Sequence, residues 1–239
     1  FTPSGRFVLS KMFFSNLTHE RLVSLSGAEN SDRLGVLDSN NITMVLTEKQ
    51  RVDILRFSGV EGGDGGGAHF VATAGSFRDI GINLNTLAVI EIDEIEDTIL
   101  PTITEIALNL SYGILTIHPS ETIEMNTIVD SRFFLSNSTG SKSIPLTGSK
   151  FRSDDEGVSI TVTLTELQRA DAVHLSNTPG GDGTAIVLDI DTDGLRDRAR
   201  NPCLNSFGLP VVEHADIILP NITGSRIYLD NGTLIVYFS

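Results

Sequence analysis

The sequence predicts an all-β chain of tandem β-sandwich repeats, each about 119 residues long. Three observations support this fold class. Apolar and polar residues alternate in short segments, similar segments recur in the same order, and one hairpin pattern occurs both inside the chain and at its end. Alternation places every second side chain on one face of a strand, so that one face is buried and the other is solvated.

The repeat is clearest between residues 42–51 (ITMVLTEKQR) and residues 160–169 (ITVTLTELQR), which share seven of ten positions. The same offset matches the glycine loops at 62–65 and 180–183. Similar offsets match residues 11–16 with 132–137, and residues 99–104 with 218–223. Because the matches keep one order along both copies, they indicate an internal duplication.

The phase of the repeat divides the chain unevenly. Residues 106–117 open the second repeat and recur as residues 226–238, but the N-terminal repeat has no such element. We therefore expect a repeat at 1–101 that lacks its first hairpin, a complete repeat at 102–220, and the first hairpin of a further repeat at 221–239. The sequence opens at Phe1 without a Met or a basic n-region, so we expect no signal peptide in it and expect the numbering to start inside a longer precursor.

Short strands account for most of the remaining chain. Residues 158–164 and 185–190 alternate strictly, residues 87–92 alternate less cleanly, and Gly, Asn, Asp and Ser clusters separate them. Two helices of about two turns are expected at 48–55 and 166–173, each after a Thr that can cap it.

The C-terminal element reads as a β-hairpin with one apolar face. Asp230, Asn231 and Gly232 favour a tight turn, because Asn and Gly tolerate positive φ. The apolar residues that alternate around this turn are Ile227, Leu229, Leu234, Val236 and Phe238. At roughly 1.5–3 kcal/mol for each buried side chain, they would contribute about 7–15 kcal/mol, as much as the net stability of a domain.

An N-terminal repeat without such a hairpin would expose its core and strand edges. We therefore expect the hairpin of one unit to complete the N-terminal repeat of the next, which gives open head-to-tail growth. The units are either segments of one long chain, which we favour, or separate subunits joined by donor-strand complementation. The other alternative, closure within one chain, would require the C-terminus to cross the whole middle repeat.

A family resemblance rests on residues 108–117 (LNLSYGILTI), 146–148 (LTG), 158–166 (VSITVTLTE) and 195–202 (LRDRARNP). They resemble the tandem immunoglobulin-like repeats of very large extracellular proteins of algae and other protists, and are similar to bacterial immunoglobulin-like surface repeats. The resemblance implies stacked sandwiches in cell-surface fibres, appendages or matrix. Arg200 stands where the family pattern has Gly, and the first repeat lacks the closing Pro at 79–83.

Composition excludes several kinds of partner. The net charge is -14, with 31 acidic and 17 basic residues, so neither nucleic acid nor an anionic membrane is an expected partner. No apolar run approaches the ~20 residues of a membrane helix, so membrane insertion is not expected. Cys203 is the only cysteine, which rules out an internal disulfide and favours a small buried side chain.

Sequons suggest the compartment. Six Asn-x-Ser/Thr motifs occur, more than this composition predicts by chance, whereas Asn177 is disqualified by Pro179. The predicted glycosylation sites are Asn16, Asn41, Asn109, Asn137, Asn221 and Asn231. They favour an extracellular or cell-surface protein that carries N-linked glycans.

Sites for chemistry are scarce. Asp189, Asp191 and Asp193 imitate the start of a calcium loop, but Arg200 stands where an EF-hand has Glu, so a solvated strand end is the competing interpretation. Calcium is the only cofactor that the sequence suggests. The glycine loops lack a Gly-Lys-Ser/Thr ending, the histidines are scattered, and no Gly-x-Ser-x-Gly elbow occurs, so we expect no catalytic residues and no enzyme.

The sequence leaves three functions to compare. We expect a structural subunit or repeat segment of an extracellular glycosylated filament, whose partners are copies of itself. The alternative is a cell-surface adhesion or carbohydrate-binding module, although a chain with no Trp and three Tyr offers little aromatic surface for sugars. A glycan-acting enzyme lacks any recognisable site.

Overall fold

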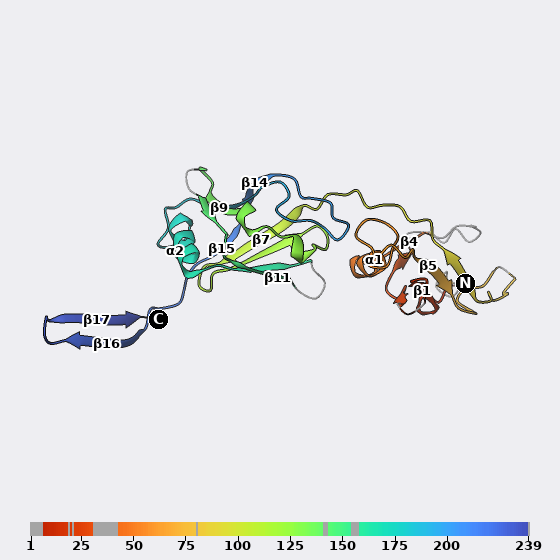
Figure 1. Ribbon diagram of the computed structural model, residues 1–239, viewed down its shortest axis with the longest axis horizontal. Helices are drawn as coiled ribbons and strands as arrows, with labels where there is room; N and C mark the ends of the chain where they lie inside the picture. The colour runs from red at the N-terminus through yellow and green to blue at the C-terminus, as the bar shows by residue number, and fades with distance from the viewer. Residues whose placement is uncertain are drawn as a thin grey trace.

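The computed structural model describes residues 7–18, 20, 22–30, 43–79, 81–140, 143–153 and 158–238. Figure 1 shows an elongated arrangement of three parts: an N-terminal lobe (residues 7–101), a central lobe (102–220) and a C-terminal hairpin that projects from the central lobe. Most regular structure is antiparallel sheet with two short α-helices, so the predicted all-β class is confirmed. No helix in these described ranges is long and apolar enough to cross a membrane.

The central lobe contains two sheets. One has the order β10-β9-β13-β14, and the other has the order β11-β12-β8-β7-β15, in which β15 runs parallel to β7. The strands of the first sheet are β9 (Phe133–Asn137), β10 (Ser143–Pro145), β13 (Ile186–Ile190) and β14 (Ser206–Pro210). Those of the second are β7 (Ile103–Asn109), β8 (Ile114–Pro119), β11 (Lys150–Ser153), β12 (Ile160–Thr163) and β15 (Val212–His214).

Aliphatic side chains from both sheets form one core between them. Leu108 and Leu115 of β7 and β8 are fully buried, and so are Leu135 of β9 and Leu188 of β13. Each such side chain contributes about 1.5–3 kcal/mol when it leaves water. Cys203 belongs to the same core, which confirms that it is a small buried residue.

The N-terminal lobe has one comparable sheet, in the order β2-β1-β5-β6. Its strands are β1 (Met12–Ser15), β2 (Leu22–Ser24), β5 (His69–Ala72) and β6 (Ala88–Glu91). With the repeat offset, this order matches β10-β9-β13-β14 of the central lobe. In the described part of this lobe, however, the second sheet contains only the short pair β3 (Glu29–Asn30) and β4 (Met44–Val45), the counterparts of β11 and β12.

Both predicted helices are present. They are α1 (Glu48–Leu55) and α2 (Glu166–Leu175), and α2 ends two residues later than expected. Each begins with a capping box. The Thr hydroxyl accepts a hydrogen bond from the backbone N–H of the Gln three residues later, and the side chain of that Gln accepts one from the Thr backbone N–H. The side chains of the same glutamines, Gln50 and Gln168, also donate to the backbone carbonyls of Ser24 and Pro145, each at 2.8 Å.

The C-terminal hairpin comprises β16 (Ile222–Tyr228) and β17 (Thr233–Phe238), which form a two-stranded sheet of their own. Gly232 in its turn has φ 71°, which confirms the predicted need for a residue that tolerates positive φ. Three 3-10 turns complete the described elements: Leu9–Lys11, Met125–Thr127 and Asp130–Arg132.

Candidate functional site

The C-terminal hairpin has the same internal pairing as the β7–β8 hairpin of the central lobe. Leu108 lies opposite Leu115 in β7–β8, and Ile227 lies opposite Leu234 in β16–β17. Each hairpin also has a register shift near its open end, between Ile103 and Glu105 in one and between Ile222 and Gly224 in the other. The chain therefore holds two versions of one hairpin.

The two hairpins differ in what covers their apolar face. Leu108 and Leu115 are fully buried, whereas Ile227 and Leu234 are 57% and 60% exposed. All of the residues predicted for the contact between units are exposed: Ile227, Leu229, Leu234, Val236 and Phe238. Among the described residues, β16 and β17 pair with each other alone. A contiguous apolar face of this kind marks an interaction surface.

The N-terminal lobe has a groove where the central lobe has its hairpin. Its volume is about 570 Å³, and most of its lining is apolar, although charged side chains such as Glu48, Arg51 and Glu121 also line it. Leu46 and Ile54 are half-buried on its wall, whereas their counterparts Leu164 and Ala172 are buried in the central core. The groove therefore lies where a hairpin equivalent to β7–β8 would cover the N-terminal lobe.

Two backbone segments flank this groove. In the central lobe the β7–β8 hairpin lies between β12 and β15, pairing with both. Their counterparts in the N-terminal lobe are β4 and residues 93–95, and the latter form no strand. Glu94 nevertheless accepts the backbone N–H groups of Gly59 and Ala68, at 2.6 and 2.5 Å. Its counterpart Glu213 accepts two equivalent bonds, at 2.9 and 2.8 Å, so the flanking segment is held as in a complete lobe.

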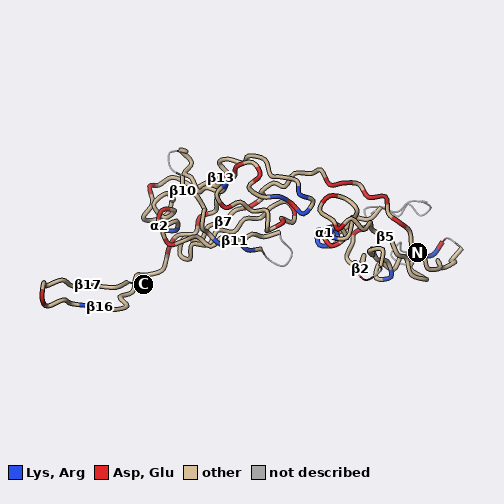
Figure 2. Tube along the Cα trace, viewed as in Figure 1, with Lys and Arg blue, Asp and Glu red and all other residues tan. Residues whose placement is uncertain are grey.

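An ion network on the wall of the groove joins the two lobes. Arg51 on α1 pairs with Glu48 at 2.7 Å and with Glu121 of the central lobe at 3.0 Å. It also pairs, at 2.6 Å, with Asp97 of the connecting segment, which is the stretch between β6 and β7 (residues 92–102). The Thr122 backbone N–H also donates to Glu48, at 2.9 Å. Figure 2 shows the acidic run on the connecting segment, to which Asp97 belongs.

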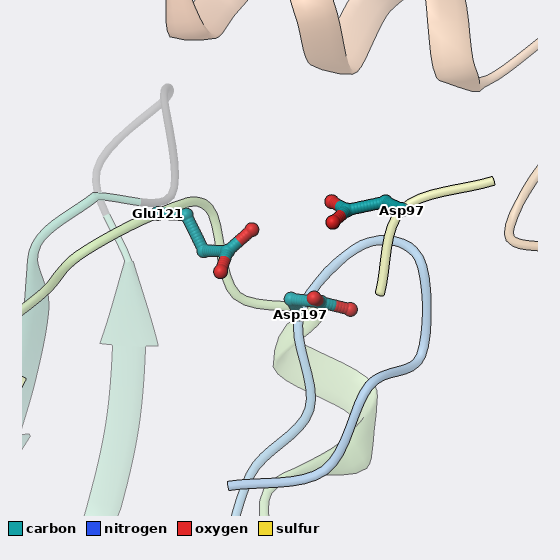
Figure 3. A group of neighbouring side chains, drawn as sticks. All are labelled: Asp97, Glu121 and Asp197. Atoms are coloured by element: carbon teal, nitrogen blue, oxygen red, sulfur yellow. The ribbon is translucent and has the colours of Figure 1, made fainter. Parts of the chain in front are cut away.

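Three carboxylates gather at this point. Oxygens of Asp97, Glu121 and Asp197 lie within 4.8 Å of one another (Figure 3). Burial raises the pKa of Glu121 to about 7, and the carboxylates around it act in the same direction, Asp197 most strongly. Burial also raises the pKa of Asp197, and it outweighs the hydrogen bonds from Asn201, which lower that pKa. Arg51 supplies the positive charge of the cluster, so we assign the cluster a structural role.

A close backbone approach completes the contact between the lobes. Gly62, which has φ 89°, lies so near Arg198 that a Cβ would overlap the Arg198 carbonyl oxygen. Asn201 donates from Nδ2 to the Asp97 carbonyl at 3.0 Å, and Arg200 pairs with Glu61 at 3.5 Å. We call this contact the internal joint.

The residues predicted for calcium lie elsewhere. Asp189 is on β13 and accepts the Gly208 backbone N–H at 2.7 Å, and Asp193 pairs with Arg196 at 2.7 Å. Asp191 follows β13, and its carbonyl faces the Cys203 thiol at 3.8 Å. The calcium prediction stays a prediction, and within the described residues the cluster with suitable spacing is the one at the internal joint.

The sequons are distributed unevenly. Asn221 and Asn231 are exposed on the C-terminal hairpin and its approach, and Asn16 and Asn109 are half-buried. Asn137 is only 3% exposed, and its side chain accepts the Thr139 hydroxyl at 2.7 Å, which leaves little room for a glycan in the folded lobe. Asn41 lies outside the described residues.

Sequence reasoning missed the residues of the internal joint. A signal was present, because Glu48, Arg51 and Asp97 recur at the repeat offset as Glu166, Arg169 and Asp216. Arg169 pairs with Glu166 at 2.7 Å and with Asp216 at 2.9 Å, so the recurrence reflects a repeated ion network. Its connection to Glu121 could not be read from the repeat, since it crosses between lobes.

Comparisons with known proteins add little. No family model and no curated protein matches the chain. Among solved structures, the chain is similar to the N-terminal part of the bacterial S-layer protein SbsC, at 12% sequence identity and a TM-score of 0.33. That match covers 58% of this chain and 31% of the S-layer chain, and at this TM-score it carries no weight for function.

Proposed function

We propose that this chain is a structural repeat unit of an extracellular, glycosylated filament or surface appendage, built from immunoglobulin-like sandwiches joined head to tail. The observation that supports this most directly is that one chain has both an exposed apolar hairpin and an open groove of the kind that a hairpin fills in the central lobe. The central lobe shows what such a pair forms when complete. The same contact serves consecutive repeats of one long chain or separate subunits.

The repeat also predicts the register of this proposed contact. Leu115 of β8 lies opposite Val162 of β12, so Leu234 of β17 would lie opposite Met44 of β4, antiparallel to it. Leu108 of β7 lies opposite Glu213 of β15, so β16 would run parallel to residues 93–95. The hairpin would thereby add two strands between β4 and the connecting segment.

Arg51 supports this register. Its counterpart Arg169 donates from Nη1 to the Leu110 carbonyl at 3.0 Å, at the turn of the central hairpin. The counterpart of Leu110 is Leu229, at the turn of the C-terminal hairpin. Docking would therefore bring the Leu229 carbonyl to Arg51, and the hairpin turn would be fixed beside the internal joint.

Energetics bear on the choice between one chain and many subunits. Burial of the hairpin face would contribute about 7–15 kcal/mol. Association of separate molecules costs about 4–15 kcal/mol in lost freedom, so free subunits would bind with only the surplus. A continuous chain holds the hairpin near its groove at a high effective concentration, which favours that arrangement.

Glycans are compatible with the docked state. Asn231 lies in the hairpin turn, and its counterpart in the central lobe is Tyr112, which is 65% exposed although its hairpin is fully packed. A glycan on Asn231 would therefore remain in solvent after docking. Glycans along such a filament would hinder lateral pairing of strand edges.

Sedimentation of the 239-residue chain over a range of concentrations tests the proposal. We expect polymers of increasing mass that electron microscopy shows as filaments with a regular axial repeat. Leu229→Asp should abolish them, because it places a charge on the face to be buried. The matched control is Ile235→Asp, which changes the opposite face, where the counterpart Thr116 is only half-buried. A wild-type chain that stays monomeric with its hairpin folded onto its own N-terminal lobe would overturn the proposal.

A further inference from the structure

Two turns in the chain share an unusual backbone geometry. The first, which we call the Asn201 turn (Asp197, Arg198, Ala199, Arg200 and Asn201), makes the internal joint. Asp197 accepts both the Asn201 backbone N–H at 2.7 Å and the Asn201 side-chain amide at 2.9 Å. Arg200 in this turn has φ 70°, a left-handed conformation that residues other than Gly rarely adopt.

The second is the Asn83 turn (Asp79, Gly81, Ile82 and Asn83) of the N-terminal lobe. Asp79 accepts the Asn83 backbone N–H at 2.8 Å and its side-chain amide at 2.9 Å, as in the Asn201 turn. Ile82 has φ 67°, which is rare for a β-branched residue. Its side chain is 65% exposed, so the turn presents an apolar residue to solvent.

The N-terminal side of the internal joint, around Gly62 and Asp97, also has a counterpart on the central lobe. Gly180, with φ 97°, is the counterpart of Gly62, and Arg169 holds Asp216 as Arg51 holds Asp97. A Cβ on Gly62 would overlap the neighbouring lobe, whereas one on Gly180 would meet only the Val173 side chain, at 3.6 Å. In Figure 1, α2 lies at the end of the central lobe from which the C-terminal hairpin projects.

We propose that the surface around Gly180 and Asp216 binds the Asn83 turn of a second copy of this chain, or of the following repeat unit. This rests on the proposed function, because a hairpin docked as β7–β8 is docked would bring these two surfaces together. The two contacts would then join the same pair of units. The hairpin supplies most of the buried apolar surface, and the turn fixes the angle between units.

One pair of facing residues differs between the internal joint and the proposed joint between units. In the internal joint Arg200 pairs with Glu61, and these positions correspond to Ile82 and Pro179 in the joint between units. An ion pair is thus replaced by two apolar residues that can pack on each other. Asn83 would donate to the Asp216 carbonyl of the other unit, as Asn201 donates to that of Asp97.

Charge transplantation in the full 239-residue chain tests this joint. Ile82→Glu and Pro179→Glu together place like charges across it, and we expect the dissociation constant for head-to-tail association to rise about tenfold. Ile82→Arg with Pro179→Glu transplants the internal ion pair and should leave that constant within about threefold of wild type. Sedimentation measures both, and thermal unfolding below the association range should be nearly the same in all variants.

The outcomes separate this joint from the hairpin contact. If wild type associates, Leu229→Asp does not, and the two-glutamate variant associates as tightly as wild type, the joint is wrong and the hairpin contact stands. If wild type and Leu229→Asp associate equally well, or if neither associates, the hairpin contact itself is overturned. A weaker two-glutamate variant that the arginine–glutamate variant restores supports both.

Discussion

Arg51 on α1 and Glu121 after β8 form an ion pair of 3.0 Å that ties the N-terminal lobe to the central lobe. Figure 3 shows that Asp97 and Asp197 lie beside Glu121. Arg51 also pairs with Asp97 and Glu48, so a single guanidinium faces several carboxylates. The angle between the lobes therefore depends on a half-buried charge network, in addition to backbone contact at Gly62.

Loss of the guanidinium should destabilise the chain. We expect Arg51→Ala to lower the free energy of unfolding by about 2 kcal/mol, because Glu48 and Asp97 would lose their charge-assisted hydrogen bonds to Arg51 at the contact between the lobes. Urea unfolding of the monomer measures this. Arg56→Ala is the matched control, since Arg56 is on the same helix and pairs with Asp53 in solvent, and it should cost under about 1 kcal/mol. Equal losses in the two variants would contradict the network.

Stability should fall as the pH rises through the range set by Glu121. Its pKa in the folded chain is about 7, against an ordinary value of 4.5, so the folded state binds more protons between these values. The unfolding free energy therefore decreases from about pH 4.5 to pH 7, by about 2 kcal/mol from this group. Glu121→Gln should flatten the profile when urea unfolding is compared at pH 5 and pH 8. A profile as steep as that of wild type would show that another group is responsible.

Leu108 and Ile227 should respond differently to truncation. Leu108→Ala should cost about 2–5 kcal/mol in the central lobe, because it leaves a cavity in a filled core. Ile227→Ala should change the monomer by less than about 0.5 kcal/mol, since its side chain is exposed. The second variant should, however, weaken association between chains. Thermal unfolding of dilute protein and sedimentation of concentrated protein check the two parts.

Glycan occupancy should follow exposure in the folded chain. We expect glycans on the exposed Asn221 and Asn231, and none on the buried Asn137. Mass spectrometry of glycopeptides from protein made in a glycosylating host measures occupancy at each position. Unchanged intact mass after enzymatic deglycosylation would remove the sequon argument, and full occupancy at Asn137 would mean that the glycan is added before the lobe closes.

Much of the architecture could be predicted because local patterns record it. Strict alternation predicted β12 and β13, and a Thr that can cap a helix predicted both helix starts. The Asn-Gly turn and its flanking apolar residues predicted the C-terminal hairpin. In each case the signal lies within a few residues, since the physical cause is a backbone turn, a cap or one buried face.

The sequence by itself determined the repeat, the strands and the apolar face of the terminal hairpin, because these depend on neighbours along the chain. Only the tertiary structure decided that Glu121 and Asp197 meet Asp97 beside Arg51, and that Asn137 is buried. Arg51 and Glu121 are 70 positions apart, and their contact exists only because two lobes pack together. Burial and charge at such a contact are properties of the assembled surfaces, which no local pattern records.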